Sequence, residues 1–395
     1  MQKKSGSSTT KPPYVVKRTP AKFFTYRGEG VREMNWGRVT AANKVISNAH
    51  FYVHNRVPPP AVDPNTWQLE VSGSALRQPR SFSYEDLLAM PAVTIVSTLE
   101  CGANGRRFFP KLAPAEAGST WEPVSGSEWR FGAIGVARWT GVRLLDVLEA
   151  AGIDQSSAVD VAVTGLDEIG YSHVVPAGKA CADDTLLVYA MNGRPLPPDH
   201  GYPCRVFFSG WGGNANVKWL GSIVVSATPI PLPHAQITQV LIGPDYPEPV
   251  VVTVQNVKSA FELDWDTTLT LPEDGVIELS GRAWSGAGPI ALVEVCARQE
   301  VERGEWREVW DPPWLSAELD QPGLAETAWT RFTLRWQGAK VGYYKLMARA
   351  TDAQGNVQPA PDEVPWNQHG LLYNGHVGHP VTLVPPGSGC MAAGD

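Results

Sequence analysis

The sequence predicts two folded domains: an α+β domain over residues 46–228 and an all-β, immunoglobulin-like domain over residues 252–385. Strand and helix patterns alternate through the first range, whereas the second holds short alternating strands with turn signals between them. A proline-rich connector over residues 229–251 separates the two ranges. Residues 1–45 are predicted to form a flexible or surface-draped arm, and residues 386–395 a tail.

The elements of the first domain are predicted from local patterns. Ser83 is a suitable N-cap for a short helix, and an apolar face over residues 144–148 predicts a second helix that ends at Gly152. Asn192-Gly193 lies between two apolar runs, which is a strong hairpin signal. We expect strands at 51–54, 67–71, 94–100, 159–165 and 186–191, and a long surface loop at 110–127.

The strands of the second domain are shorter and alternate between apolar and polar residues. They are expected within residues 275–286, 291–296, 306–310, 331–336 and 342–350. This pattern is typical of an immunoglobulin-like sandwich.

The composition is that of a globular protein, with 43% hydrophobic and 18% charged residues. The formal net charge of −7 argues against a nucleic-acid partner but is compatible with a local basic site for an anion. No apolar run approaches membrane-spanning length, so we expect no membrane span. The first twenty residues lack an export signal, which predicts a cytoplasmic location, or a periplasmic one if a leader was removed.

The cysteines indicate free thiols, because the five are widely spaced and odd in number. The absence of Cys-x-x-Cys pairs leaves zinc ribbons, iron–sulfur clusters and attached haem without support.

Cys101 ends a predicted buried strand, and a small Gly-rich turn and Arg106-Arg107 follow it. Nearby cations lower a thiol pKa and favour the thiolate, which binds soft metals. A buried, inert cysteine is the alternative.

A second dense motif lies between residues 192 and 220. It contains three basic side chains in a Gly- and Pro-rich frame: His200, Arg205 and Lys218. Arg binds phosphate as a fork, Lys acts as a point charge, and Gly-rich turns expose backbone N–H groups to anions. The motif therefore indicates a cofactor with a phosphate tail. Each residue alone would more often be a surface charge or a satisfied histidine.

These motifs resemble the sulfite oxidase family of molybdopterin oxidoreductases, in its bacterial form without a haem domain. Cys101–Arg106 is similar to the family's molybdenum-binding cysteine loop, and residues 192–220 are similar to its pterin-binding segments. Residues 51–64 match its Phe-Tyr-Val-Arg-Asn-His frame, with the Arg and the His exchanged. Residues 281–286 and 352–359 resemble its dimerisation domain. The resemblance implies a molybdopterin-binding domain followed by an Ig-like dimerisation domain.

The resemblance also implies a cofactor, molybdenum held by one molybdopterin and by the thiolate of Cys101. His200, Arg205 and Lys218 would hold the pterin and its phosphate. Further cofactor-binding candidates are Asn55, Arg56 and Arg143. Arg143 is equally well explained as a surface charge at a helix start.

For the substrate, the resemblance implies that Arg106 holds a small anion. Two further arginines of the family's sulfite oxidases are replaced here by His54 and His369. Because His titrates near neutral pH, we expect weaker binding of a dianion at pH 8 than at pH 6. Trp129 matches a tryptophan that borders the pocket, with core packing as the alternative. Tyr246 is the best match to an active-site tyrosine, with a surface tyrosine as the alternative.

Three functions are compatible with these features. The first is oxidation of sulfite to sulfate by two-electron oxygen-atom transfer, and the second is the same chemistry on another sulfur compound or an S- or N-oxide. The third is a cofactor-free binding protein with an Ig-like module, against which the basic motif argues. No haem or flavin motif is present, so we expect a separate electron acceptor: a cytochrome, a quinone-linked protein or oxygen. The resemblance to the family's dimerisation domain implies a homodimer.

Overall fold

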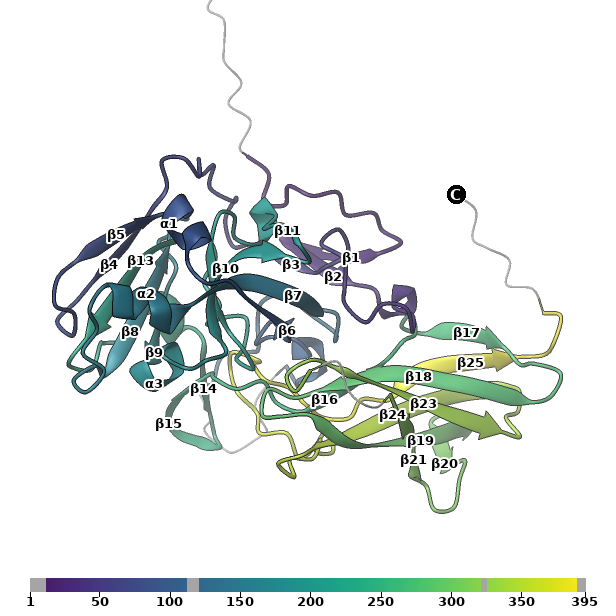
Figure 1. The fold of residues 1–395 in the computed structure, drawn as a ribbon. Coiled ribbons are helices and arrows are strands. Elements are labelled where there is room, and N and C mark those ends of the chain that lie inside the picture. Colours follow the sequence, from purple (N-terminus) through teal and green to yellow (C-terminus); the bar gives the residue numbers. More distant parts are fainter. Residues whose placement is uncertain (1–11, 112–120, 321–324, 389–395) are drawn as a thin grey trace, which may run out of the picture.

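The computed structural model describes residues 12–111, 121–320 and 325–388. Parts of the predicted arm, of the 110–127 loop and of the tail lie outside these residues. Figure 1 shows a first, mixed domain beside an elongated sandwich of strands, with the β14–β15 hairpin near their junction. Among the described residues, no helix combines the length and hydrophobicity needed to cross a bilayer.

The first domain is built on two five-stranded sheets. One has the order β11-β10-β7-β6 with β12 paired to β10, and all its pairs are antiparallel. The other has the order β5-β4-β13-β8-β9, and its β4–β13 pair is parallel. The bounds are β4 Gln68–Ser72, β5 Arg80–Ser83, β6 Val93–Glu100, β7 Ile134–Arg143, β8 Asp160–Gly165, β9 Ser172–Pro176, β10 Thr185–Met191, β11 Arg194–Pro195, β12 Arg205–Phe208 and β13 Leu220–Ser226.

Short helices connect these strands: α1 Tyr84–Ala89, α2 Leu144–Ala150 and α3 Ala177–Ala180, with 3₁₀ turns η2 Arg106–Phe108 and η3 Pro198–His200. Ser83 caps α1 in a capping box with Asp86, as its sequence predicts. The chain leaves α2 through Gly152 in a left-handed conformation. Asn192 and Gly193 both have positive φ and join β10 to β11, so the predicted hairpin is confirmed.

The N-terminal segment and the connector are more ordered than predicted. β1 Phe24–Gly28, β2 Val31–Met34 and β3 Val53–His54 form a small sheet, followed after β2 by the turn η1 Trp36–Arg38. Its apolar side chains Phe24, Val31 and Trp36 are buried, so this part of the arm belongs to the core. The connector contains α4 His234–Ile237 and a hairpin of β14 Val240–Gly243 and β15 Tyr246–Val251. Proline content alone did not reveal these elements.

The second domain is an all-β sandwich of two sheets around one apolar core. The first sheet contains β16 Lys258–Phe261, β18 Val276–Trp284, β22 Glu318–Leu319 and β23 Thr330–Gln337. The second contains β17 Thr267–Thr270, β19 Ile290–Glu302, β20 Glu305–Glu308, β21 Leu315–Ser316, β24 Gly342–Asp352 and β25 His379–Val384. The predicted fold class, an α+β domain followed by an all-β domain, is confirmed.

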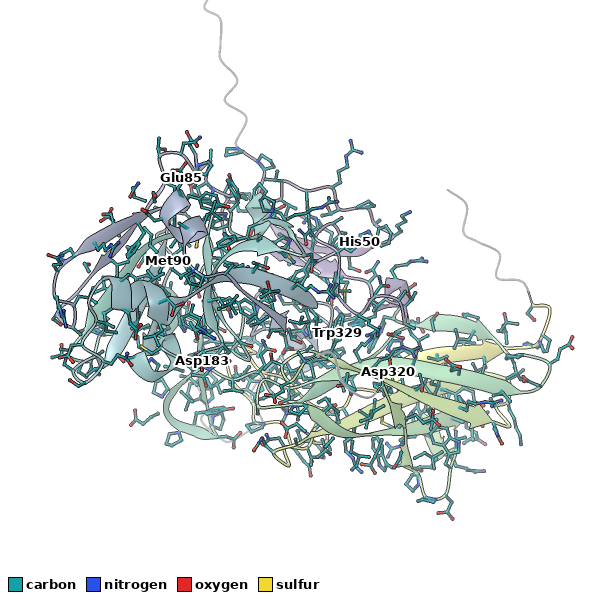
Figure 2. All side chains as sticks on the ribbon, in the orientation of Figure 1. His50, Glu85, Met90, Asp183, Asp320 and Trp329 are labelled. Carbon is teal, nitrogen blue, oxygen red and sulfur yellow. The ribbon has the colours of Figure 1, made fainter. Side chains whose placement is uncertain are left out.

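The two domains share a hydrophobic core. Trp36 of the first domain packs on Trp284 and Trp329 of the second, with ring centroids 6.0 and 5.7 Å apart. Trp329, labelled in Figure 2, also donates its indole N–H to the carbonyl of Lys44 at 3.1 Å. Burial of these large rings stabilises the junction strongly, because each aromatic removes a large apolar area from water.

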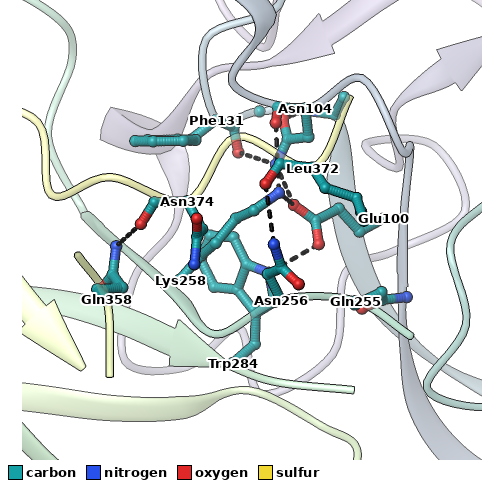
Figure 3. A network of polar contacts seen from close by, with 12 residues as sticks. Glu100, Asn104, Phe131, Gln255, Asn256, Lys258, Trp284, Gln358, Leu372 and Asn374 are labelled. Carbon is teal, nitrogen blue, oxygen red and sulfur yellow. Dashed lines mark hydrogen bonds and ion pairs between the residues drawn. The ribbon is translucent and has the colours of Figure 1, made fainter. Parts of the chain in front are cut away.

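A buried ion pair also crosses this junction (Figure 3). Lys258 of β16 donates its ammonium to the Oε1 of Glu100 at 2.6 Å, and the two residues are 0% and 1% exposed. Asn104 and Trp284 donate to the same carboxylate at 2.9 and 3.1 Å. Glu100 directly precedes Cys101, so this network ties the cysteine loop to the second domain.

We predict that Lys258→Met destabilises the protein by about 3–5 kcal/mol, because Glu100 then remains buried without its counter-charge. Thermal or denaturant unfolding of the purified variant measures this loss.

The matched control is Arg298→Met, which breaks the half-exposed Arg298–Glu308 pair of β19 and β20. Such surface pairs contribute about 0–1 kcal/mol. Equal, small losses in both variants would contradict a special role for the buried pair.

Candidate active site

A cavity of about 340 Å³ opens beside the end of β6. Most of its wall comes from segments that are far apart in the sequence, namely residues 51–57, 99–106, 199–205 and 213–219, with further residues from 126–127, 167–171, 238–239 and 371. It brings together seven of the predicted site residues: His54, Arg56, Cys101, Arg106, His200, Arg205 and Lys218.

Cys101 lies at the point where β6 ends and the glycine-containing turn begins. Its N–H donates to the carbonyl of Ala133 at 2.9 Å, and Gly105, at φ 92°, lets the chain turn into η2. The thiol Sγ is 3.5 Å from Nδ1 of His54. Burial raises the pKa of the Cys101 thiol, although Arg106 and Arg56 oppose this shift. The predicted lowering of this pKa is therefore wrong for the protein alone; a bound metal would favour the thiolate.

The two arginines that follow Cys101 point in different directions. Arg106 lines the cavity, and its Nε donates to the carbonyls of His369 and Gly370 at 3.1 and 3.3 Å. Arg107 instead pairs with Glu128 at 2.9 Å on the surface. Only Arg106 of this pair can therefore contact a molecule in the cavity.

His54 lines the cavity but is not poised to titrate near neutral pH. Burial, and then the charges of Lys218, Arg56 and Arg106, lower its pKa to about 3. In the protein without cofactor His54 is therefore neutral between pH 6 and 8, which argues against a contribution of this residue to the expected pH dependence of anion binding. Trp129 packs edge-on against the His54 ring at 5.6 Å and is fully buried behind it.

Besides Trp129 and Asn55, three candidates have side chains outside the cavity lining. His369 directs Nδ1 at the carbonyl of Val240, at 2.8 Å, and only its backbone contacts Arg106. Tyr246, at the start of β15, lines a neighbouring pocket with Leu241. Arg143 lies 3.7 Å from Asp183 in an exposed ion pair, which agrees with the alternative of a surface charge.

The cavity also contains an unpredicted tyrosine, Tyr171. Its hydroxyl donates to the carbonyl of Asn214 at 2.8 Å and accepts from Gln239 at 2.7 Å. Burial raises the pKa of Tyr171 to about 12. The guanidinium of Arg56 lies 5.8 Å from the centre of the ring. No motif surrounds Tyr171, so only the fold brings it to the site.

A second group of lining residues, His200, Arg205 and Lys218, is basic and is called the basic end of the cavity below. Arg205 donates to the carbonyls of His200 and Asn216 at 3.0 and 2.7 Å. Lys218 donates to the carbonyls of His54 and Asp199 at 3.0 and 3.1 Å, and to the side-chain oxygen of Asn55. Asn55 itself does not line the cavity but braces Lys218.

The pKa values at this end are lowered, because buried positive charges lose hydration. Burial lowers the pKa of Arg205 to about 10. Burial and the charge of Arg205 lower the pKa of Lys218 to about 7. The pKa of His200 lies well below its ordinary value for the same reason, with Lys17 and Lys218 adding to the shift.

These residues fit a bound anion such as the phosphate of molybdopterin. Among the described residues, the buried Nε of Arg205 has no hydrogen-bond partner. An unpartnered buried donor is costly, and a phosphate oxygen would satisfy it while favouring the charged forms of its neighbours.

The fold and the cavity thus define a molybdopterin-binding oxidoreductase. Residues 54–233 match the family described as oxidoreductase molybdopterin binding domain, and residues 250–382 match the Mo-co oxidoreductase dimerisation domain. The chain belongs to the sulfite oxidase family, whose enzymes use a molybdenum cofactor.

Similar proteins include two vertebrate enzymes. Mitochondrial sulfite oxidase of Mus musculus is 34% identical over 355 residues, which cover 86% of this chain and 62% of that protein. Sulfite oxidase of Gallus gallus is 31% identical over 343 residues, 82% of this chain and 70% of that protein. The chain thus spans less than two thirds of the mouse protein.

A solved structure has the same fold. The crystal structure of the sulfane dehydrogenase SoxCD from Paracoccus pantotrophus matches with a TM-score of 0.72, covering 94% of this chain and 92% of that chain. The two sequences are 22% identical.

We predict that Arg205→Met lowers the pterin content of the purified protein by about tenfold or more, since it removes charge-assisted hydrogen bonds to the phosphate. Pterin released by denaturation and measured by its fluorescence gives the content per chain.

Arg194→Met is the control, because Arg194 is exposed on β11 and does not line the cavity. It should retain the wild-type content. Equal pterin content in both variants would contradict the assignment of this end of the cavity to the phosphate.

Proposed function

We propose that this protein oxidises sulfite to sulfate at a molybdenum cofactor and passes two electrons to a separate acceptor. The arrangement of Cys101 and Arg106 around one cavity, with the basic residues at its other end, carries this proposal. The same cavity then contains a thiol for the metal, an arginine for an anionic substrate and a site for the phosphate. Membership of the sulfite oxidase family supports it.

When bound, the molybdenum cofactor supplies two-electron oxygen-atom transfer. Cys101 would provide the thiolate that holds the metal. His200, Arg205 and Lys218 would hold the pterin and its phosphate. With these residues assigned to the cofactor, Arg106 and Arg56 remain to bind the substrate.

Arg106 is suited to hold an oxyanion because two backbone carbonyls fix its Nε. Its remaining N–H groups are donors for a small anion. Burial lowers the pKa of Arg106, and a bound anion would favour its charged form. Because the side chain of Arg106 is fixed, the position of a bound substrate would not depend on a flexible group.

Arg56 would provide the second positive charge. It is exposed at the cavity, and its charge acts on both Cys101 and Arg106. Compared with the family pattern, Arg and His are exchanged between positions 54 and 56. The neutral His54 therefore lies beside the thiol, and the arginine lies at the more exposed position 56. Tyr171, whose hydroxyl stays protonated at neutral pH, would border the substrate.

A second candidate is the same chemistry on another sulfur compound or on an S- or N-oxide. The neutral state of His54 favours it, because fewer positive charges attract a dianion.

For assembly, we propose a homodimer through the dimerisation domain. The acceptor would be a cytochrome, a quinone-linked protein or oxygen.

We predict that Arg106→Gln and Arg56→Gln each lower kcat/KM for sulfite by about 10–100-fold, chiefly through a higher KM, because a charged hydrogen bond to the anion is lost. Steady-state kinetics of the cofactor-loaded enzyme with a chemical electron acceptor measures this effect.

Arg107→Gln is the matched control. It removes the same charge one residue away, where the side chain faces Glu128, and should change kcat/KM by less than about threefold. Loaded enzyme that turns over a neutral sulfoxide but not sulfite would contradict the first candidate and favour the second.

A further inference from the structure

Residues 14–17 of the N-terminal segment are attached to Asp199 and His200, two residues that line the cavity. The backbone N–H groups of Val16 and Lys17 both donate to the carboxylate of Asp199, at 2.9 Å each. Asn55 donates to the carbonyl of Tyr14 at 2.7 Å and to Asp199 at 3.1 Å. The segment is therefore attached to the η3 turn, which contains Asp199 and His200, by several hydrogen bonds across more than 180 residues of sequence.

The side chain of Lys17 continues inward from this attachment. Its ammonium donates to the carbonyls of Asn48, at 3.0 Å, and Phe51, and lies 3.4 Å from Nε2 of His200. Phe51 and His200 both line the cavity, whereas Lys17 lies directly behind them. Burial lowers the pKa of Lys17 to about 7. In its charged form the ammonium has only donors, so it would donate to an unprotonated Nε2 of His200.

The segment also changes the charge balance of the site. Asp199 is buried and lines the cavity, and its negative charge attracts Lys218. The two backbone N–H groups of residues 16 and 17 satisfy that carboxylate, and the amino group of Lys17 lies beside the site. Burial lowers the pKa of Lys17 to about 7, Asp199 opposes this shift, and a bound anion would further favour the charged form. Both effects leave more net positive potential for an anionic group in the cavity.

We propose that residues 14–17 form part of the cofactor site, in which Lys17 is a positioning residue that holds His200 and strengthens binding of the pterin phosphate. The proposal rests on the assignment of this end of the cavity to the pterin and does not depend on the identity of the substrate. It gives the N-terminal segment a function that its composition does not indicate.

The first test compares cofactor retention in Lys17→Met and Arg18→Met. Arg18 is the adjacent, exposed residue, so its variant removes the same charge without touching His200. After loading with cofactor and dilution, Lys17→Met should lose pterin about tenfold faster than wild type. Arg18→Met should lose it within about twofold of the wild-type rate. Equal rates in all three proteins would overturn the proposal.

Thermal unfolding of the cofactor-free proteins separates positioning from simple destabilisation. Lys17→Arg, which keeps the charge, should restore most of the retention. If pterin loss in Lys17→Met merely followed a lower melting temperature, and Lys17→Arg did not rescue it, the role would be structural and the proposal wrong.

Hydrogen exchange of the wild-type protein provides a test that needs no variant. The amides of residues 16 and 17 should exchange about tenfold more slowly with the cofactor bound than without it, because anion binding stabilises the attached segment. Unchanged exchange would contradict the proposal. None of these three measurements uses turnover, so failure here is distinguishable from failure of sulfite oxidation.

Discussion

The buried ion pair between Glu100 and Lys258 constrains the position of the cysteine loop. Glu100 ends β6 and directly precedes Cys101, whereas Lys258 begins the first strand of the sandwich. Asn104, from the same loop, and Trp284, from the sandwich, complete the hydrogen bonds of the carboxylate. Because an unpaired buried charge is costly, the loop has one favourable position relative to the second domain. The dimerisation domain therefore supports the site as well as any subunit contact.

Charge is distributed unevenly along the cavity that this constraint helps to shape. The basic end contains Arg205 and Lys218, whose pKa values are lowered by burial, and for Lys218 also by the charge of Arg205. A phosphate would remove much of that cost. The other end holds the thiol, a neutral histidine and two arginines of different exposure, an arrangement suited to a small anion. One cavity thus provides separate sites for cofactor and substrate.

Much of this site could be predicted from the sequence because its central residues lie in short, dense motifs. Cys101, Arg106, His200, Arg205 and Lys218 come together as the family resemblance implied. The sequence could not predict features that depend on long-range packing. Tyr171 and Lys17 reach the site through contacts without a motif, and the side chain of His369 turns away toward Val240. The pKa of His54 differs from its ordinary value because of burial, which spacing cannot reveal.

Elemental analysis of the purified protein tests the central claim most directly. From a host that makes the cofactor, we expect about one molybdenum per chain in wild type and close to none in Cys101→Ser. Cys181→Ser is the control, because Cys181 is a free, partly buried thiol outside the cavity, and it should keep the metal. Wild-type protein without molybdenum would contradict the assignment of the cavity to a molybdenum cofactor. A Cys101→Ser variant that retains the metal would contradict the assignment of Cys101 as its ligand.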